Sequence, residues 1–166
     1  MSEPNMTQQE QDGRADFDLF IGNWKAHHRR LRERLKGSTS WEEFDSMTVA
    51  RKILGGLGNM DEITLSRESG ATLGMTVRLF DPKTRQWSLY WADNLNGWNW
   101  SLPQIGEFKD GVGKFYAHEP FEGKHIISRY IWSSSSETSC HWEQAFSADG
   151  GSTWETNWTM DFERIA

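Results

Sequence analysis

The sequence predicts an all-β protein, a single antiparallel up-and-down β-barrel of about eight to ten strands with a short helical turn at its N-terminal end. Short runs in which apolar and polar residues alternate recur along the chain, as expected for half-buried strands. Turn signals such as Asp-Gly separate these runs at short intervals, which favours a meander. The 166 residues include ten Trp, nine Phe and three Tyr, and aromatic side chains favour strands and fill cores.

One domain is expected, residues 14–166, preceded by a disordered tail, residues 1–13. The chain has the usual length of one domain. The first residues are rich in Gln, Glu, Ser and Asn and have no apolar periodicity. After them Phe17 and Phe20 have the spacing of a helical turn, which Gly22 would end. We expect this turn to plug one end of the barrel.

Residues 24–36 carry conflicting signals. Their apolar residues recur at helical spacing, and the many Arg, Leu, Glu and Lys residues favour a helix. Residues 37–40, however, are typical of a turn between paired strands, and residues 41–54 are β-compatible with no strong helical stripe. We therefore predict a strand for residues 24–36, a choice that also rests on the family resemblance described below.

The rest of the chain has plainer strand signals. Residues 74–91 contain two alternating runs around an Asp-Pro turn, which predicts a hairpin. In the second run Trp87, Leu89 and Trp91 alternate with other side chains, so these three are expected to face inward. Further strands are expected at about residues 105–109, 113–118, 125–132, 139–147 and 154–163.

Two loops carry distinct signals. Residues 93–103 form the longest irregular piece and include Trp98 and Trp100, so we interpret them as a candidate lid. Residues 147–154, SADGGSTW, match the Asp-box pattern of sialidases and other β proteins. We expect this pattern to be structural, with the Asp149 carboxylate bonding backbone amides of the turn. By itself the pattern supplies none of the paired carboxylates that glycosidases need.

Composition argues against several classes of function. With 18 Lys and Arg against 24 Asp and Glu, the net charge is −6, so neither a nucleic acid nor a membrane is an expected partner. No apolar run approaches the ~20 residues that cross a bilayer. The single Cys140 and an N-terminus without a signal-peptide pattern predict a cytoplasmic location. The five His residues lack metal-ligand spacing, and we expect no metal and no cofactor.

Several stretches carry a resemblance to a known family. They are FIGNW at residues 20–24, GGLGNMDE at 55–62, RLFDP at 78–82 with WSLYW at 87–91, and HWEQAFSADGGSTWETNWTMDF at 141–162. Over about residues 16–164 the chain resembles an uncharacterised bacterial family of calycins, which are lipocalin-like or fatty-acid-binding-protein-like barrels classed as domains of unknown function. The resemblance implies a barrel with an internal cavity and no settled activity. The haem-binding nitrobindins have a glycine-rich run after their first Trp. Here Lys, Ala and two His follow Trp24, so haem is not expected.

The first long strand contributes candidate ligand-binding residues. If Trp24 points inward, the period of two also sends Ala26, His28 and Arg30 toward the cavity, and Arg32 as well if the strand extends that far. His and Arg buried beside Trp would suit a ligand with an acidic group. The alternative is a solvated basic strand that pairs with acidic residues of the next strand. These residues are Glu42, Glu43 and Asp45.

Strand parity also predicts the cavity walls. The inward residues of the last two strands would be Trp142, Gln144, Phe146, Trp154, Thr156, Trp158, Met160 and Phe162. Gln144 is a polar residue among aromatic ones and needs a partner from protein, water or ligand. The candidate ligand-binding residues are therefore Trp24, His28, Arg30, Trp91, Trp142, Gln144 and Trp158.

Three functions are compatible with these residues. The first is binding of a small hydrophobic or amphipathic molecule, with or without an acidic group, in the barrel cavity. The second is an isomerase, hydrolase or lyase that uses His28 as acid or base, for which the sequence identifies no catalytic partner. The third is a structural or interaction module, either a monomer or a homodimer, in which aromatic side chains fill the barrel.

Overall fold

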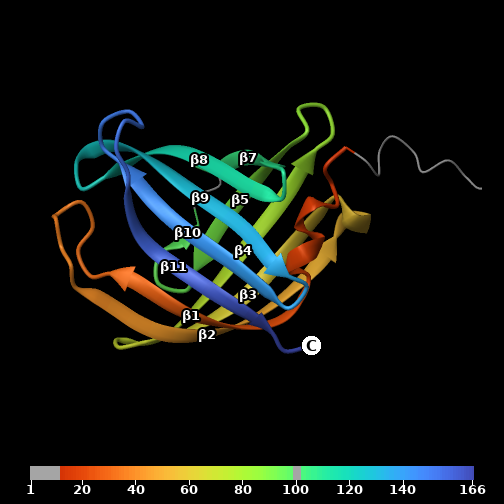
Figure 1. The fold of residues 1–166 in the computed structure, drawn as a ribbon, viewed down its shortest axis with the longest axis horizontal. Helices are drawn as coiled ribbons and strands as arrows, with labels where there is room; N and C mark the ends of the chain where they lie inside the picture. The colour runs from red at the N-terminus through yellow and green to blue at the C-terminus, as the bar shows by residue number, and fades with distance from the viewer. Residues whose placement is uncertain (1–11, 99–101) are drawn as a thin grey trace, which may run out of the picture.

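The computed structural model describes residues 12–98 and 102–166. Residues 1–11 of the expected tail and residues 99–101 of the expected lid, Trp100 included, lie outside the described residues. Within the described ranges no helix is long and apolar enough to cross a membrane. The elements in chain order (Figure 1) are η2 (Asp16–Phe20), β1 (Gly22–Leu31), β2 (Trp41–Ile53), η3 (Leu54–Gly56), β3 (Gly58–Arg67), β4 (Gly70–Asp81), β5 (Gln86–Asp93), β6 (Gly97–Trp98), β7 (Gln104–Lys109), β8 (Val112–Phe121), β9 (Lys124–Ser136), β10 (Ser139–Ser147) and β11 (Glu155–Arg164).

The strands form one closed antiparallel barrel (Figure 1). Each strand from β1 to β5 pairs with the next, β5 pairs with β7, and the meander continues to β11. The pairing of β11 with β1 closes the barrel and places Trp158 opposite Arg30. β6 is a two-residue strand beside β5, so ten of the eleven strands make the wall. The predicted all-β up-and-down barrel is confirmed, because closure leaves no long strand with an unpaired edge.

Residues 24–36 do contain a strand, but β1 ends at Leu31. After Leu31 the chain leaves the sheet and turns, with Leu35 and Gly37 at the positive φ values of 58° and 68°. Arg32 therefore lies outside the barrel, where its guanidinium forms an exposed ion pair with Glu68 at 2.6 Å. The expectation that Arg32 faces the cavity is wrong, because the period of two ends with the strand.

The short turn η2 plugs one end of the barrel, as predicted. Phe17 and Phe20 are each 1% exposed and face the interior. The Phe17 ring meets Trp87 edge-on at 5.0 Å, and the Phe20 ring lies 4.6 Å from that of Trp132. Aromatic contacts of this kind stabilise the core beyond the burial of apolar area alone. The barrel is thus closed by aromatic side chains at the end where η2 lies.

A β-bulge interrupts the parity of β11. Gln144 pairs with Trp158 and Ala145 pairs with Thr156, so Asn157 is the additional residue. An extra residue moves every residue before it to the opposite face. Trp154 accordingly packs outside the barrel, with the Arg129 guanidinium 4.2 Å from its ring centre. The expectation that Trp154 shares the inward face of Trp158 is wrong for this reason.

The Asp-box turn between β10 and β11 is held by short-range hydrogen bonds. Asp149 accepts a hydrogen bond from the backbone N–H of Thr153 at 2.8 Å, and Ser147 accepts one from that of Gly151 at 2.8 Å. The Trp154 indole donates to the Gly151 carbonyl at 3.1 Å. These bonds satisfy the backbone of the turn, which agrees with the structural interpretation of the pattern.

Candidate ligand-binding cavity

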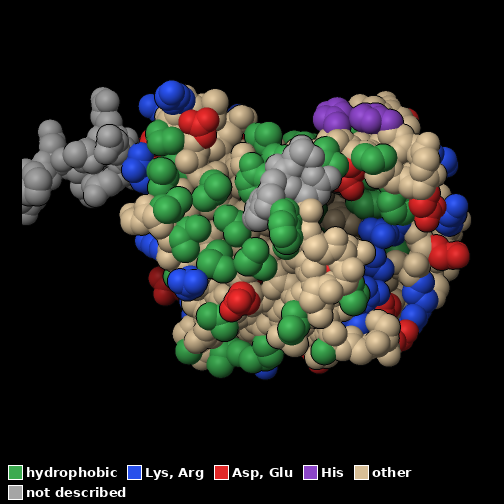
Figure 2. Space-filling model, turned by 180° about the vertical axis from the view of Figure 1, so that it is seen from behind, with side chains coloured by type: hydrophobic (Ala, Val, Ile, Leu, Met, Phe, Trp, Pro, Cys, Tyr) green, Lys and Arg blue, Asp and Glu red, His purple; other side chains and the backbone are tan. Residues whose placement is uncertain are grey.

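The interior of the barrel contains a cavity of about 460 Å³. This volume lies within the range of small-molecule sites in proteins. Figure 2 shows the hollowed face of the molecule, with blue Lys and Arg side chains gathered beside the hollow. The described residues that line the cavity come from η2, most of the wall strands, the turn after β1 and the segment 93–98.

The floor of the cavity, at the end closed by η2, holds a buried ion pair. Arg78 on β4 contacts Asp61 on β3 at 2.5 Å and donates to the Asn59 side chain at 2.9 Å. The Arg78 guanidinium also lies 5.3 Å from the ring centres of Phe20 and Trp132. Buried charges are stable when they are paired and hydrogen-bonded, and both conditions hold here.

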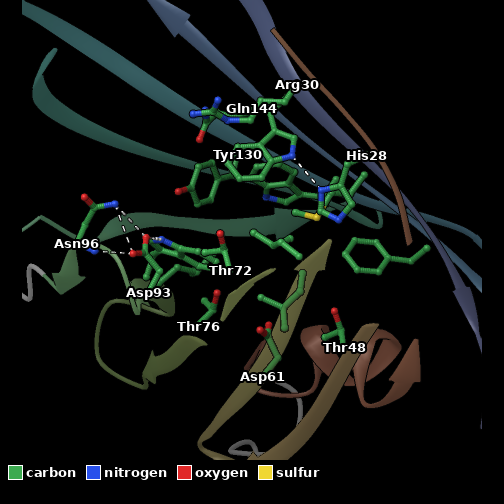
Figure 3. A pocket seen from close by; sticks show the side chains of 18 of the residues that line it. His28, Arg30, Thr48, Asp61, Thr72, Thr76, Asp93, Asn96, Tyr130 and Gln144 are labelled. Carbon is green, nitrogen blue, oxygen red and sulfur yellow. Dashed lines mark hydrogen bonds between the residues drawn. The ribbon is translucent and has the colours of Figure 1, made fainter. Parts of the chain in front are cut away.

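His28 lies midway along the cavity wall and is fully buried (Figure 3). The Trp158 indole donates a hydrogen bond to His28 Nδ1 at 3.0 Å. A nitrogen that accepts carries no proton, so His28 Nε2 carries the proton and donates to Ser46 Oγ at 2.7 Å. Burial, and then the charge of the neighbouring His27, lower the pKa of His28 to about 3. His28 is thus a neutral side chain whose two ring nitrogens are both engaged within the protein.

Aromatic side chains form the wall beside His28. The rings of Trp142 and Trp158 meet edge-on with centres 5.7 Å apart. Tyr130 meets Trp142 in the same manner at 5.0 Å. Burial raises the pKa of the Tyr130 hydroxyl, so this side chain is neutral. The wall offers flat apolar surfaces to a ligand, interrupted by few polar atoms.

Three arginines face the mouth of the cavity: Arg30 on β1, Arg34 in the following turn and Arg67 at the end of β3. Arg67 pairs with the buried Glu42 at 2.7 Å. Arg30 stacks on Trp158 at 5.1 Å, and within the described residues it makes no ion pair. Burial, and then the charges of Arg34 and Arg67, lower the pKa of Arg30 to about 10. The charge of Glu42 acts in the opposite direction, but within the described residues Arg30 forms no ion pair with it or with another carboxylate.

The segment 93–98 lies on the opposite side of the mouth. Asp93 accepts hydrogen bonds from the backbone N–H groups of Leu95 at 2.9 Å and Asn96 at 2.7 Å (Figure 3). It also accepts one from the Trp91 indole at 3.0 Å. The Trp91 ring lies directly over Gly74, where a Cβ atom would come within 2.1 Å of the ring. These contacts fix Trp91 and the first part of the segment that we interpret as a candidate lid.

Of the seven predicted ligand-binding residues, six line the cavity: His28, Arg30, Trp91, Trp142, Gln144 and Trp158. Trp24 faces inward but lies beyond the floor, because η2 fills that end of the barrel. Its indole donates to the Phe20 carbonyl at 3.0 Å, and the Arg164 guanidinium lies 4.2 Å from its ring centre. Gln144 donates to the Asn157 side chain at 2.9 Å, so protein atoms supply its partner.

Several polar residues that line the cavity are not among those predicted from the sequence. Arg78 precedes the inward Phe80 by two residues, so the period of two would have placed it inside. Asp61 has the same relation to Ile63. Arg34 falls within the predicted strand 24–36 and has the parity of Arg30, but it lies in the irregular turn after β1, where the period of two does not apply. The other missed polar residues are Thr48, Arg67, Thr72, Thr76, Asp93, Asn96 and Tyr130.

Comparison with known proteins supports the fold. Neither a protein-family model nor a curated protein matches the sequence. The solved structure of the S-type phycobiliprotein lyase CPES from Guillardia theta is similar, with a TM-score of 0.59 over 98% of this chain and 99% of that one. The sequences are 11% identical, so the likeness concerns the fold alone. Together with the closed ten-stranded wall, it shows that the chain has a lipocalin-like barrel fold.

Proposed function

We propose that this protein binds a small amphipathic molecule with an acidic group inside the barrel. The observation that carries the proposal is a cavity of about 460 Å³ with aromatic walls and, at its mouth, arginines that lack an ion-pair partner in the described residues. The aromatic walls suit the apolar part of the ligand, and the arginines suit the acidic group. The six predicted residues that line the cavity belong to this proposed site.

The apolar part of the ligand would lie against Trp142, Trp158 and the aliphatic side chains across the cavity. Leu89 and Ile63 face the cavity from β5 and β3 and are 3% and 5% exposed. Flat rings on one side and branched side chains on the other can enclose a ring system or an extended chain. Transfer of such a group from water would supply most of the binding free energy.

The acidic group would lie near Arg30 and Arg34. Within the described residues, four arginines and two aspartates line the cavity, a net charge of +2 inside a protein whose overall charge is −6. Asp61 pairs with Arg78, and Glu42, behind the wall, pairs with Arg67. Arg30 and Arg34 are the two cavity arginines left without such a pair in the part of the chain described. Their guanidinium groups have the geometry to bind a carboxylate in bidentate fashion.

Two alternatives are less well supported. An enzyme that uses His28 as acid or base would need a ring nitrogen that is free to exchange a proton, whereas both nitrogens of His28 are hydrogen-bonded and its pKa is lowered to about 3. A barrel filled by its own side chains is at odds with a cavity of about 460 Å³. The protein of similar fold is named as a lyase, so a barrel of this kind can also have an enzymatic activity. Homodimer formation stays a prediction.

A matched pair of fluorescent probes tests the proposal. Anilinonaphthalenesulfonate and N-phenylnaphthylamine share one ring system, and only the first carries an anionic group. We expect both to bind with their emission enhanced and the sulfonate to bind more tightly. In Arg30→Gln or Arg34→Gln, sulfonate affinity should fall by about tenfold, while affinity for the neutral probe should be unchanged.

Arg29→Gln is the control for these variants. Arg29 neighbours Arg30 on β1, but its side chain is 51% exposed and packs over Trp41 on the outer face. We expect it to leave the affinity for both probes unchanged. Failure of both probes to bind the wild-type protein would contradict the proposal. Equal loss of sulfonate affinity in Arg29→Gln and Arg30→Gln would contradict the assignment of the acidic group to the mouth.

A further inference from the structure

Three buried polar atoms near the cavity floor have no hydrogen-bonding partner in the described part of the protein. They are Arg78 Nε, Trp132 Nε1 and Thr48 Oγ1. The three residues are 2%, 3% and 2% exposed, and all three line the cavity. Leaving a buried polar group without a partner costs free energy, and nearly all such groups in native proteins are hydrogen-bonded. A molecule bound in the cavity can supply the partner for these three.

The three residues belong to one end of the cavity. The Arg78 guanidinium lies 5.3 Å from the Trp132 ring, and both lie beside η2. Figure 3 shows Thr48 and Asp61 at this same end, near the helical turn, whereas Arg30 and Gln144 lie at the other end. The floor and the mouth are therefore separate polar regions, with the apolar wall between them.

The chemistry of the floor selects a neutral hydrogen-bond acceptor. Arginine and indole N–H groups only donate, and the Thr48 hydroxyl can donate as well. A carboxylate would meet the side chain of Asp61, which is already paired with Arg78. Like charges at short range repel strongly in a buried site. A carbonyl oxygen brings the missing lone pairs without a second negative charge.

We infer that the cavity floor is a second polar subsite, which takes a neutral acceptor such as a ketone or amide oxygen at the far end of the ligand from its acidic group. The inference rests on the proposed function and narrows it. The ligand class is an acid with an apolar middle and a distal carbonyl group. Such a ligand would satisfy the arginines at the mouth and the unpartnered donors at the floor together.

Two synthetic ligands test the inference. They are a medium-chain alkanoate and the same chain with a keto group beside its terminal methyl, so that they differ by one oxygen at the distal end. Isothermal titration calorimetry should give a dissociation constant about tenfold lower for the keto acid with the wild-type protein. Trp132→Phe and Thr48→Val should each reduce this advantage several-fold, because each removes one hydrogen-bonding group from the floor. Thr48→Val also keeps the shape of the side chain, whereas Trp132→Phe leaves a smaller ring.

Trp87→Phe is the matched control. Trp87 Nε1 is also buried without a hydrogen-bonding partner among residues 12–98 and 102–166, yet Trp87 is not one of the residues that line the cavity. We expect this variant, like the wild-type protein, to bind the keto acid more tightly than the alkanoate. If Trp132→Phe fails to fold, a downfield shift of the Trp132 indole proton in the wild-type protein with keto acid, absent with alkanoate, gives the same information.

Each outcome has a distinct meaning. Equal affinity of the wild-type protein for the two ligands would overturn the floor subsite and leave the proposed function standing. An advantage that survives both Trp132→Phe and Thr48→Val would overturn it as well. If the wild-type protein binds neither ligand and neither fluorescent probe, the proposed function falls, and the floor subsite falls with it.

Discussion

The indole of Trp158 donates a hydrogen bond to Nδ1 of His28 at 3.0 Å, and this bond joins the two strands that close the barrel. Because Nδ1 accepts, His28 can act only as a neutral donor toward Ser46. The Phe44 ring stacks on the imidazole at 4.5 Å and completes its enclosure. The most inward histidine of the chain is therefore a structural element of the cavity wall.

His28 should make the protein sensitive to acid. Its pKa is lowered from 6.5 to about 3, so the unfolded state binds the proton between these values and the folded state does not. The contribution of His28 to stability is full above about pH 6.5 and decreases as the pH falls toward about 3. Between about pH 7 and about pH 5, the free energy of unfolding of the wild-type protein should fall by about 2 kcal/mol more than that of His28→Gln. Urea unfolding at a series of pH values measures this difference.

His27→Gln is the control for this experiment. Hydrogen bonds with Glu43, and then with Asp45, raise the pKa of His27, so its contribution is present at low pH and is lost as the pH rises. This variant should keep the acid sensitivity that His28 causes. Parallel pH profiles for His28→Gln and the wild-type protein would contradict a buried neutral His28.

The ion pair between Asp61 and Arg78 should be strongly coupled. Replacing Arg78 by Met leaves the Asp61 carboxylate buried without its cation, and we expect a loss of about 3 to 5 kcal/mol in the free energy of unfolding. The double variant Asp61→Leu with Arg78→Met should recover part of that loss, because no uncompensated charge is left inside. A double-mutant cycle by chemical denaturation measures the coupling. Additive effects of the two substitutions would contradict a direct pair.

Substitution by Ala should have different effects on the melting temperature at Gly106 and at Gly74. At Gly106 a Cβ atom would come within 1.9 Å of the Lys114 backbone carbonyl, whereas at Gly74 it would meet the Trp91 ring at 2.1 Å. Backbone in a paired strand cannot move aside, but a half-exposed ring can. Gly106→Ala should therefore lower the melting temperature more than Gly74→Ala. Only Gly74→Ala should weaken probe binding, since it displaces a residue that lines the cavity. Equal melting temperatures would contradict this account.

Substitution of Trp24 should affect stability alone, whereas substitution of Trp142 should affect ligand binding. Trp24→Phe removes the indole donor to the Phe20 carbonyl and should cost about 1 to 3 kcal/mol of stability with no change in probe affinity. Trp142→Ala removes part of the cavity wall and should weaken both fluorescent probes. Thermal unfolding and probe titration on the same samples compare the two. Weaker probe binding in Trp24→Phe would place Trp24 within the site after all.

Sequence periodicity predicted the barrel, since the period of two holds wherever a strand is regular. For His28 and Arg30 it left two alternatives open, a cavity-facing side and a solvated basic strand, and the structure has both residues lining the cavity. Periodicity failed at Trp154 because the bulge at Asn157 depends on how β10 pairs with β11, which local sequence does not encode. Periodicity also assigned Trp24 to the cavity. It gives the direction of a side chain, inward or outward, but does not reveal that η2 fills the end of the barrel where Trp24 lies. The unpartnered groups at the floor depend on three-dimensional contacts and lie outside the reach of sequence reasoning.

Native mass spectrometry of the protein purified from its host tests whether the barrel holds an acidic amphipathic ligand. We expect one acidic small molecule bound per chain of the wild-type protein and none in Arg30→Gln. This molecule should quench tryptophan emission when it is added back to the ligand-free protein. A spectrum with the mass of the bare chain alone, together with no change in emission across a panel of acidic lipids and aromatic acids, would contradict the proposed function.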